Sequence, residues 1–278
     1  MIKQLIGGAA ALSLAAAGAG AGVAAAVSPA QEAPPTVGLA VSAKAVQVTG
    51  AEALKAGPTT LRITAAGKGE LAPAVLELKP GVTHEQVAQA AKELGTMAGE
   101  KLGTLVASTF FVGGGAPYST TVDLDPGEHV VLNFGRKGAT VVGFFTVGAE
   151  RSAAVKPAPA ATVSMHDYRF GGASTLPRGG TIRVTNDGKV QHHALVMPLK
   201  KGVDTKRVLK DLRAGKEPAY ALGGPPSALT EVVSPGTTND VQTTPSKAGK
   251  YLLVCFLQNS PKQPPHAVQG MAKVVTVK

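Results

Sequence analysis

Short stretches in which apolar and polar residues alternate follow one another along most of the chain. Residues 181–185 (TIRVT) alternate β-branched and polar side chains, and the next three, Asn-Asp-Gly, are a typical turn sequence. Residues 251–256 (YLLVCF) are continuously apolar, which is typical of a strand buried on both faces. Gly and Pro separate these runs. The pattern predicts a mostly β protein built from short strands.

Two segments break this pattern with apolar residues at helical spacing. The first begins with the capping box Thr83-His-Glu-Gln86, in which the Thr and Gln side chains bond each other's backbone N–H groups. Val87 then starts an apolar stripe. The second begins at the expected N-cap Asp204 and has Val208 and Leu212 on one side. We expect one short helix in each segment.

An internal repeat relates the two halves of the chain. Residues 60–87 align with residues 181–208 without a gap, and 11 of the 28 aligned positions are identical. Chance gives about two identities at average residue frequencies. Residues 127–134 match residues 249–256 at a nearly equal offset, so the similarity extends to a later strand. The chain therefore contains one unit twice.

Each unit has the size and strand pattern of a Greek-key β-sandwich with one short helix inserted. The predicted fold class is all-β, with two tandem sandwiches. We expect the first copy at 38–150, a Pro- and Ala-rich linker at 151–161, and the second copy at 162–278.

The first 26 residues form an Ala- and Gly-rich apolar run with Lys3 near its start and small residues at its end. This pattern is typical of a signal peptide. Cleavage is expected after Ala26, with Ala30 as the alternative. A retained N-terminal anchor is the other interpretation, but the run has low hydrophobicity per residue for a permanent span. We therefore expect a secreted or extracytoplasmic protein with no transmembrane span after leader removal.

Composition and charge exclude several classes of site and of binding partner. The single cysteine excludes an intrachain disulfide framework and any all-cysteine metal or iron–sulfur site. Residues 151–278 carry 18 Lys and Arg against 7 Asp and Glu, whereas residues 27–150 carry 9 against 11. The basic half suits an acidic redox partner or an anionic envelope surface, with a merely solvated basic surface as the alternative. Nucleic-acid binding is not expected, because no DNA-binding motif or aromatic platform accompanies the basic residues.

The two copies differ at positions that can bind a metal. The second copy alone has His192, His193, Cys255, His266 and Met271. The first copy has Leu71 and Ala72 in place of the histidine pair and Asn133 in place of the cysteine. Two imidazoles and one thiolate, with a weak axial thioether, form a blue, or type 1, copper site. Methionine is a poor zinc ligand, so the set favours copper.

Residues 161–278 resemble the plastocyanin-like (cupredoxin) copper-binding domain of secreted bacterial proteins. The resemblance rests on residues 163–170 (VSMHDYRF), 176–180 (LPRGG), 184–188 (VTNDG), 192–193 (HH), 249–256 (GKYLLVCF), 265–266 (PH) and 270–271 (GM). It implies one copper ion held by His192, Cys255, His266 and Met271. His193 remains the alternative to His192. Only one of the two is expected to bind the metal, because adjacent strand residues point to opposite faces. Ten residues separate Cys255 from His266, more than in short-loop cupredoxins.

The resemblance implies a one-electron carrier made of two cupredoxin-like sandwiches, of which the first is a degenerate copy without metal ligands. His266 is expected to be exposed and to be the point where electrons leave. A copper buffering or delivery protein and a metal-free β-sandwich interaction module are the alternatives. We do not expect an enzyme, because no catalytic motif is present and copper oxidases need further histidine-rich sites. The chain has only 6 histidines.

Overall fold

The computed structural model describes residues 32–278 apart from 68, 94–98, 113, 136–137 and 243–244. The predicted leader at residues 1–26 lies outside the described residues. The described residues belong to one compact unit. Within them, no helix combines the length and apolar character needed to cross a membrane.

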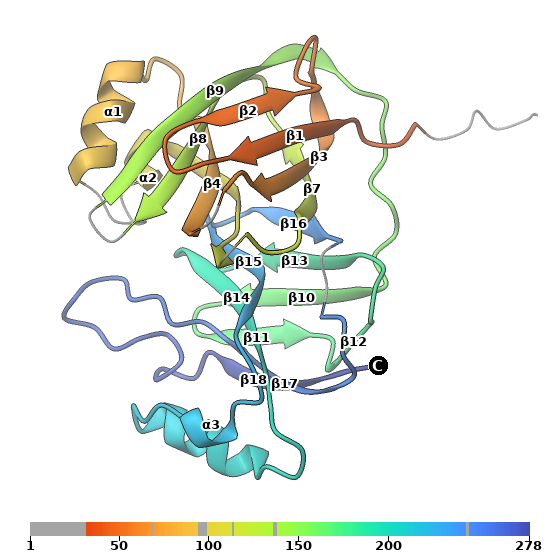
Figure 1. The fold of residues 1–278 in the computed structure, drawn as a ribbon, viewed down its shortest axis with the longest axis vertical. Coiled ribbons are helices and arrows are strands. Elements are labelled where there is room, and N and C mark those ends of the chain that lie inside the picture. The colour runs from red at the N-terminus through yellow and green to blue at the C-terminus, as the bar shows by residue number, and fades with distance from the viewer. Residues whose placement is uncertain (1–31, 68, 94–98, 113, 136–137, 243–244) are drawn as a thin grey trace, which may run out of the picture. The chain divides into compact units, whose positions relative to one another are not determined.

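The structure is mostly β, which confirms the predicted all-β class (Figure 1). The first copy contains β1 (Thr36–Val41), β2 (Val46–Thr49), β3 (Lys55–Ala65), β4 (Glu70–Leu78), α1 (His84–Glu93), α2 (Gly99–Leu102), β5 (Gly103–Ser108), β6 (Phe111–Val112), β7 (Tyr118–Leu124), β8 (Gly127–Gly135) and β9 (Gly138–Arg151). The second copy contains β10 (Ala161–His166), β11 (Arg169–Gly172), β12 (Thr175–Leu176), β13 (Ile182–Asn186), β14 (His192–Pro198), α3 (Thr205–Arg213), β15 (Ser227–Val233), β16 (Thr238–Val241), β17 (Gly249–Val254) and β18 (Ala272–Val277). A 3-10 turn, η2 (Ala219–Ala221), lies between α3 and β15.

The two copies repeat one strand-pairing scheme. β1 pairs antiparallel with β2 and parallel with β3, and β10 pairs in the same way with β11 and β13. β4 lies between β5 and β8, and β8 pairs with β9. Likewise β14 lies between β15 and β17, and β17 pairs with β18. The repeat read from the sequence is therefore also a repeat of topology.

The copies are joined edge to edge. β7 of the first copy pairs antiparallel with β16 of the second, so one sheet runs through both. Beside this contact the Leu105 N–H donates to Ser234 Oγ at 3.0 Å, and Ser108 Oγ donates to the Val232 carbonyl at 2.7 Å. The largest buried apolar cluster also includes residues from both copies. This pairing was not predicted, because it depends on which sheet edges meet.

The two expected helices, α1 and α3, begin as the sequence predicts, whereas the single turn α2 was not predicted. Thr83 Oγ1 accepts a bond from the Gln86 N–H at 3.2 Å, and Gln86 Oε1 accepts one from the Thr83 N–H at 2.9 Å, which completes the capping box. Asp204 accepts bonds from two backbone N–H groups of the first turn of α3. Val208 and Leu212 of α3 are buried against the outer face of β17. α1 and α3 thus each cover one sheet of their own copy.

β17 is buried on both faces, as its continuous apolar sequence predicts. Leu252 and Val254 pack toward α3, whereas Tyr251 and Leu253 belong to the central cluster on the other face. Cys255 follows the end of the strand and continues the inward-facing series. Strand alternation therefore places the thiol inside the second copy, between its two sheets.

Candidate metal centre

The histidine pair opens β14, so its two side chains point to opposite faces of the sheet. His192 is fully buried and faces the thiol of Cys255. His193 lies on the opposite face, where its Nε2 accepts a bond from the Phe256 N–H at 2.6 Å. Its Nδ1 faces Glu231 at 3.7 Å. The backbone N–H of His193, unlike its ring, faces the thiol and lies 3.5 Å from Cys255 Sγ.

Three of the predicted ligand residues converge. His192 Nδ1 lies 3.1 Å from His266 Nδ1, and Cys255 Sγ lies 3.4 Å from His266 Nδ1 and 4.0 Å from His192 Nδ1. All three residues are fully buried. Among the described residues, this is the one group of three or more His, Cys, Asp or Glu close enough to hold a metal ion together.

Met271, the fourth predicted ligand, is buried in the same apolar cluster as Cys255. Its backbone N–H donates to the His266 carbonyl at 2.9 Å, and its carbonyl accepts from the Cys255 N–H at 3.1 Å. These two bonds close the loop 255–271 and hold Met271 beside both residues. An axial role for its sulfur stays a prediction.

The expected exposure of His266 is wrong. The residue is fully buried, because the loop that carries it folds back over the ring. Asn259 Oδ1 accepts a bond from His266 Nε2 at 2.9 Å, and the Tyr168 ring lies 4.7 Å from the imidazole ring. Phe256, the residue after Cys255, is 38% exposed.

The other imidazole also has a partner for its outer nitrogen. His192 Nε2 donates to Asp167 Oδ1 at 3.0 Å, because a carboxylate can only accept. With the hydrogens on Nε2 of His192 and of His266, both Nδ1 atoms present lone pairs to each other. Two lone pairs held 3.1 Å apart repel unless a proton or a cation lies between them. The partners thus prepare both rings for metal binding.

The protonation states suit such a site. Burial lowers the pKa of His266 to about 4, and the nearby His192 contributes in the same direction. Burial also lowers the pKa of His192, although Asp167 opposes the shift. Both imidazoles are therefore neutral at pH 7, the form that binds metals. Burial raises the pKa of the Cys255 thiol to about 12, so metal binding must release its proton.

The three separations fit one ion. Metal–nitrogen bonds of about 2.1 Å and metal–sulfur bonds of about 2.3 Å add up to about 4.2 Å between two nitrogens and about 4.4 Å between nitrogen and sulfur. The observed separations of 3.1, 3.4 and 4.0 Å are all shorter than these sums. One cation can therefore contact all three atoms, and the donor set of two imidazoles and a thiol is one that copper accepts.

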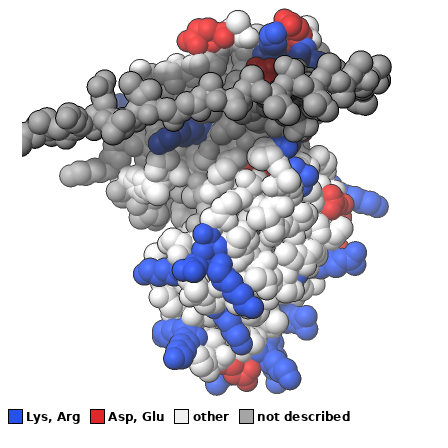
Figure 2. Space-filling view, turned by 90° about the vertical axis from the view of Figure 1, so that its right-hand side faces the viewer, with Lys and Arg blue, Asp and Glu red and all other residues white. Residues whose placement is uncertain are grey.

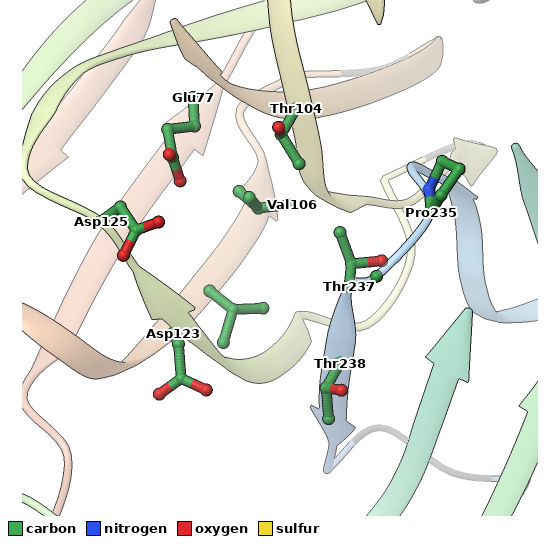
Figure 3. A pocket seen from close by; sticks show the side chains of 10 residues that line it. Glu77, Thr104, Val106, Asp123, Asp125, Pro235, Thr237 and Thr238 are labelled. Carbon is green, nitrogen blue, oxygen red and sulfur yellow. The ribbon is translucent and has the colours of Figure 1, made fainter. Parts of the chain in front are cut away.

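A cavity of about 270 Å³, separate from the candidate metal centre, lies where the copies meet (Figure 3). Three carboxylates line it, from Glu77, Asp123 and Asp125. Asp123 is paired with Lys156 at 2.6 Å, and within the described part of the chain these carboxylates do not form a metal-binding group. The cavity therefore adds no second centre.

Sequence reasoning missed three residues that contact the rings: Asp167, Tyr168 and Asn259. Asp167 and Tyr168 form the turn between β10 and β11. Both lie within residues 163–170, one of the stretches that carry the family resemblance, but that pattern does not show where their side chains point. Asn259 lies in the long loop, where no periodic pattern constrains side-chain direction.

The sequence matches no known protein-family model and no curated protein. Solved structures similar to it include auracyanin B, with 20% identity over 45% of this chain and 93% of that chain and a TM-score of 0.27. Auracyanin A, a blue copper protein from Chloroflexus aurantiacus, has 19% identity over 42% and 98% of the two chains and a TM-score of 0.24. Lac15 from a marine microbial metagenome has 13% identity over 89% and 66% and a TM-score of 0.29. These structural similarities do not assign a function to this chain. The functional argument rests on the geometry of the site itself.

Proposed function

We propose that this chain is a secreted, cupredoxin-like protein that binds one copper ion in its second copy and carries single electrons. The observation that supports the proposal best is the buried convergence of His192 Nδ1, His266 Nδ1 and Cys255 Sγ. Imidazole suits Cu(II), whereas thiolate, and the thioether of Met271 behind it, suit Cu(I). A donor set acceptable to both oxidation states is what an electron carrier needs.

Bound copper would supply a one-electron couple, and the protein's part is to hold the ligands in one arrangement. His192 and Cys255 are attached to β14 and β17, neighbouring strands of one sheet. His266 is tied to the loop by Asn259. Burial of all three residues excludes water from the ligand atoms. A rigid, dry site changes little when the charge on the ion changes, which favours fast electron transfer.

The first copy is proposed to be a metal-free partner that supports the second. At the equivalent positions it carries Leu71 and Asn133, neither of which binds copper in the way that imidazole and thiolate do. The shared sheet through β7 and β16 gives it a structural role.

The charge of the second copy supports the proposed partners. On the face shown in Figure 2, Lys and Arg side chains predominate over the second copy. Residues 151–278 carry 18 basic and 7 acidic side chains. Such a surface would steer an acidic redox partner or hold the protein at an anionic envelope surface, and the attraction would weaken with salt.

The proposed route for electrons leads from Cys255 to its covalent neighbour Phe256. The buried His266 offers no exposed edge, whereas Phe256 reaches solvent. Phe256 also borders a groove of about 320 Å³ that includes Leu212 and Pro265. We therefore propose that electrons leave through the exposed ring of Phe256 and not, as expected from the sequence, through the imidazole of His266.

Voltammetry of the copper-loaded protein separates a carrier from a copper buffer. We expect a reversible one-electron wave with the copper retained in both oxidation states. A site that binds Cu(I) and loses copper on oxidation would favour the buffering or delivery alternative instead. Oxidase assays with phenolic substrates under air test the proposal that the protein is not an enzyme, and sustained turnover would contradict it.

A further inference from the structure

The turn between β10 and β11 contacts both imidazoles of the candidate metal centre. Asp167 Oδ1 accepts from His192 Nε2 at 3.0 Å. The next residue, Tyr168, packs its ring 4.7 Å from that of His266. Its hydroxyl accepts from Asn259 Nδ2 at 2.8 Å, and Asn259 Oδ1 in turn accepts from His266 Nε2 at 2.9 Å. One two-residue turn thus fixes the orientation of both rings.

The two supports differ in charge. His192 is bonded to a carboxylate, whereas His266 is bonded to a neutral amide. Both carboxylate oxygens of Asp167 also accept from the Lys189 N–H at 3.0 Å, so the group is held in place. The side chain of Asp167 is only 27% exposed, which limits the screening of its charge by water.

The neighbouring turn leaves room for this contact. A Cβ atom at Gly188 would clash with the Asp167 carboxylate and with the His192 ring. A larger residue at this position would have to displace one of the two groups. The absence of a side chain at Gly188 therefore leaves room for the ring–carboxylate bond.

The first copy has no such turn. Its β1–β2 connection runs from Ser42 to Ala45, and it is closed by a bond from Ser42 Oγ to the Ala45 carbonyl at 3.0 Å. It contains no Asp or Tyr. The turn residues and the ligand residues therefore differ between the copies together, which links the turn to the metal centre rather than to hairpin formation.

We propose that Asp167 is a positioning residue that directs His192 Nδ1 to the metal and favours oxidised over reduced copper, so that it lowers the reduction potential of the site. This inference rests on the proposed copper site. A carboxylate that accepts a hydrogen bond from a ligand imidazole raises the basicity of that imidazole. Its negative charge also stabilises Cu(II) more than Cu(I), because Cu(II) carries one more positive charge. Asn259 orients His266 without this effect.

The test compares Asp167→Asn with Asp187→Asn in copper-loaded protein. Asp187 lies in the next turn, is exposed, and accepts from Thr185 Oγ1. Both variants remove one charge from the same end of the second copy, but only the first touches a ligand ring. For Asp167→Asn we expect Cu(II) affinity to fall about 10–100-fold, with a smaller loss for Cu(I). For each factor of ten by which the loss of Cu(II) affinity exceeds the loss of Cu(I) affinity, the reduction potential rises by about 59 mV.

A second variant reverses the effect. Asn259→Asp places a carboxylate against His266, so the potential should fall below that of the wild type.

In the copper-free protein, nitrogen NMR of the imidazoles gives a readout independent of the metal. It should show the hydrogen of His192 on Nε2 in the wild type and a mixture of tautomers in Asp167→Asn.

Equal shifts in Asp167→Asn and Asp187→Asn would overturn the inference, because charge alone would then explain them. So would an unchanged potential in both Asp167→Asn and Asn259→Asp. If Asp167→Asn does not fold, a potential for Asn259→Asp at or above the wild-type value is sufficient to reject the inference. A wild-type protein that binds no copper would overturn the proposed function, and this inference with it.

Discussion

The two copies share a pairing scheme but differ where β8–β9 and β17–β18 turn back. In the first copy the hairpin stays paired out to Gly135 and Gly138. In the second copy the chain leaves the sheet after Val254 and returns at Ala272. The longer connection of the second copy, residues 255–271, carries Cys255, His266 and Met271. The comparison shows that the candidate metal centre depends on one longer loop and a few side chains, whereas the pairing scheme of the main strands is common to both copies.

One hydrogen bond is common to both copies. In the first, the Ala72 N–H donates to Asn133 Oδ1 at 2.9 Å. In the second, the N–H of the equivalent residue His193 donates to Cys255 Sγ at 3.5 Å. The scaffold therefore provides a backbone donor at this position whether or not a metal binds. In the second copy that donor opposes the rise in the pKa of Cys255 that burial causes, and it would stabilise the thiolate if a metal bound.

The largest expected effect comes from giving the second copy the residue of the first. Cys255→Asn should lower copper affinity by more than the roughly 100-fold typical of losing an outer hydrogen bond, because it removes a ligand. Competition with a chelator of known affinity measures the loss. Asn133→Cys is the matched control, since it adds a thiol to the first copy without imidazoles. A copper site of similar affinity in Asn133→Cys would contradict the account.

Core substitutions test whether the copies unfold together. Leu61 in the first copy and Leu253 in the second are both fully buried. Replacing either by Ala should destabilise the protein by about 2–5 kcal/mol. Because one sheet and one core cluster span both copies, each variant should shift a single urea transition. Two transitions, of which each variant moves only one, would show that the copies are independent.

The buried imidazoles make the stability of the copper-free protein depend on pH. The pKa of His266 falls to about 4 on folding, and that of His192 is also lowered, so the unfolded chain binds more protons in mildly acidic solution. Stability should therefore be fully present above about pH 6.5 and decline as the pH falls toward 4. Urea midpoints over this range measure the slope, which His266→Asn should flatten. An unchanged slope in that variant would contradict the assigned cause.

Helix caps give the smallest expected difference between the copies. Asp204 accepts bonds from the Lys206 and Arg207 N–H groups, whereas Thr83 accepts one from Gln86. Asp204→Ala should cost about 1 kcal/mol, and Thr83→Ala should cost less. Thermal unfolding of both variants measures the ranking. A larger loss from Thr83→Ala would mean that α1 matters more to the fold than its contacts indicate.

Much of the fold was predictable because its signals are local. The repeat, the strand buried on both faces and both helix caps follow from short patterns of residues. The joining of the copies through β7 and β16 was not predictable, since edge pairing depends on residues far apart in sequence. The strands also extend beyond the expected boundaries, because β1 begins at Thr36 and β10 at Ala161.

The candidate site was predictable in composition but not in detail. Differences between the copies singled out the ligand residues, and the structure brings His192, Cys255 and His266 together. Alternation along β14 separates His192 from His193, but only the folded sheet shows which side is inward. The exposure of His266 was misjudged because Asn259 and Tyr168 cover it, and neither was recognisable from sequence as its neighbour.

Anaerobic copper titration of the mature protein, followed by visible absorption, tests the central claim most directly. The account predicts one copper ion per chain and the strong visible band of a copper–thiolate bond, with both absent in Cys255→Asn. Failure to bind copper at micromolar metal would contradict it. Binding that survives unchanged in Cys255→Asn would contradict it equally, because the copper would then lie elsewhere.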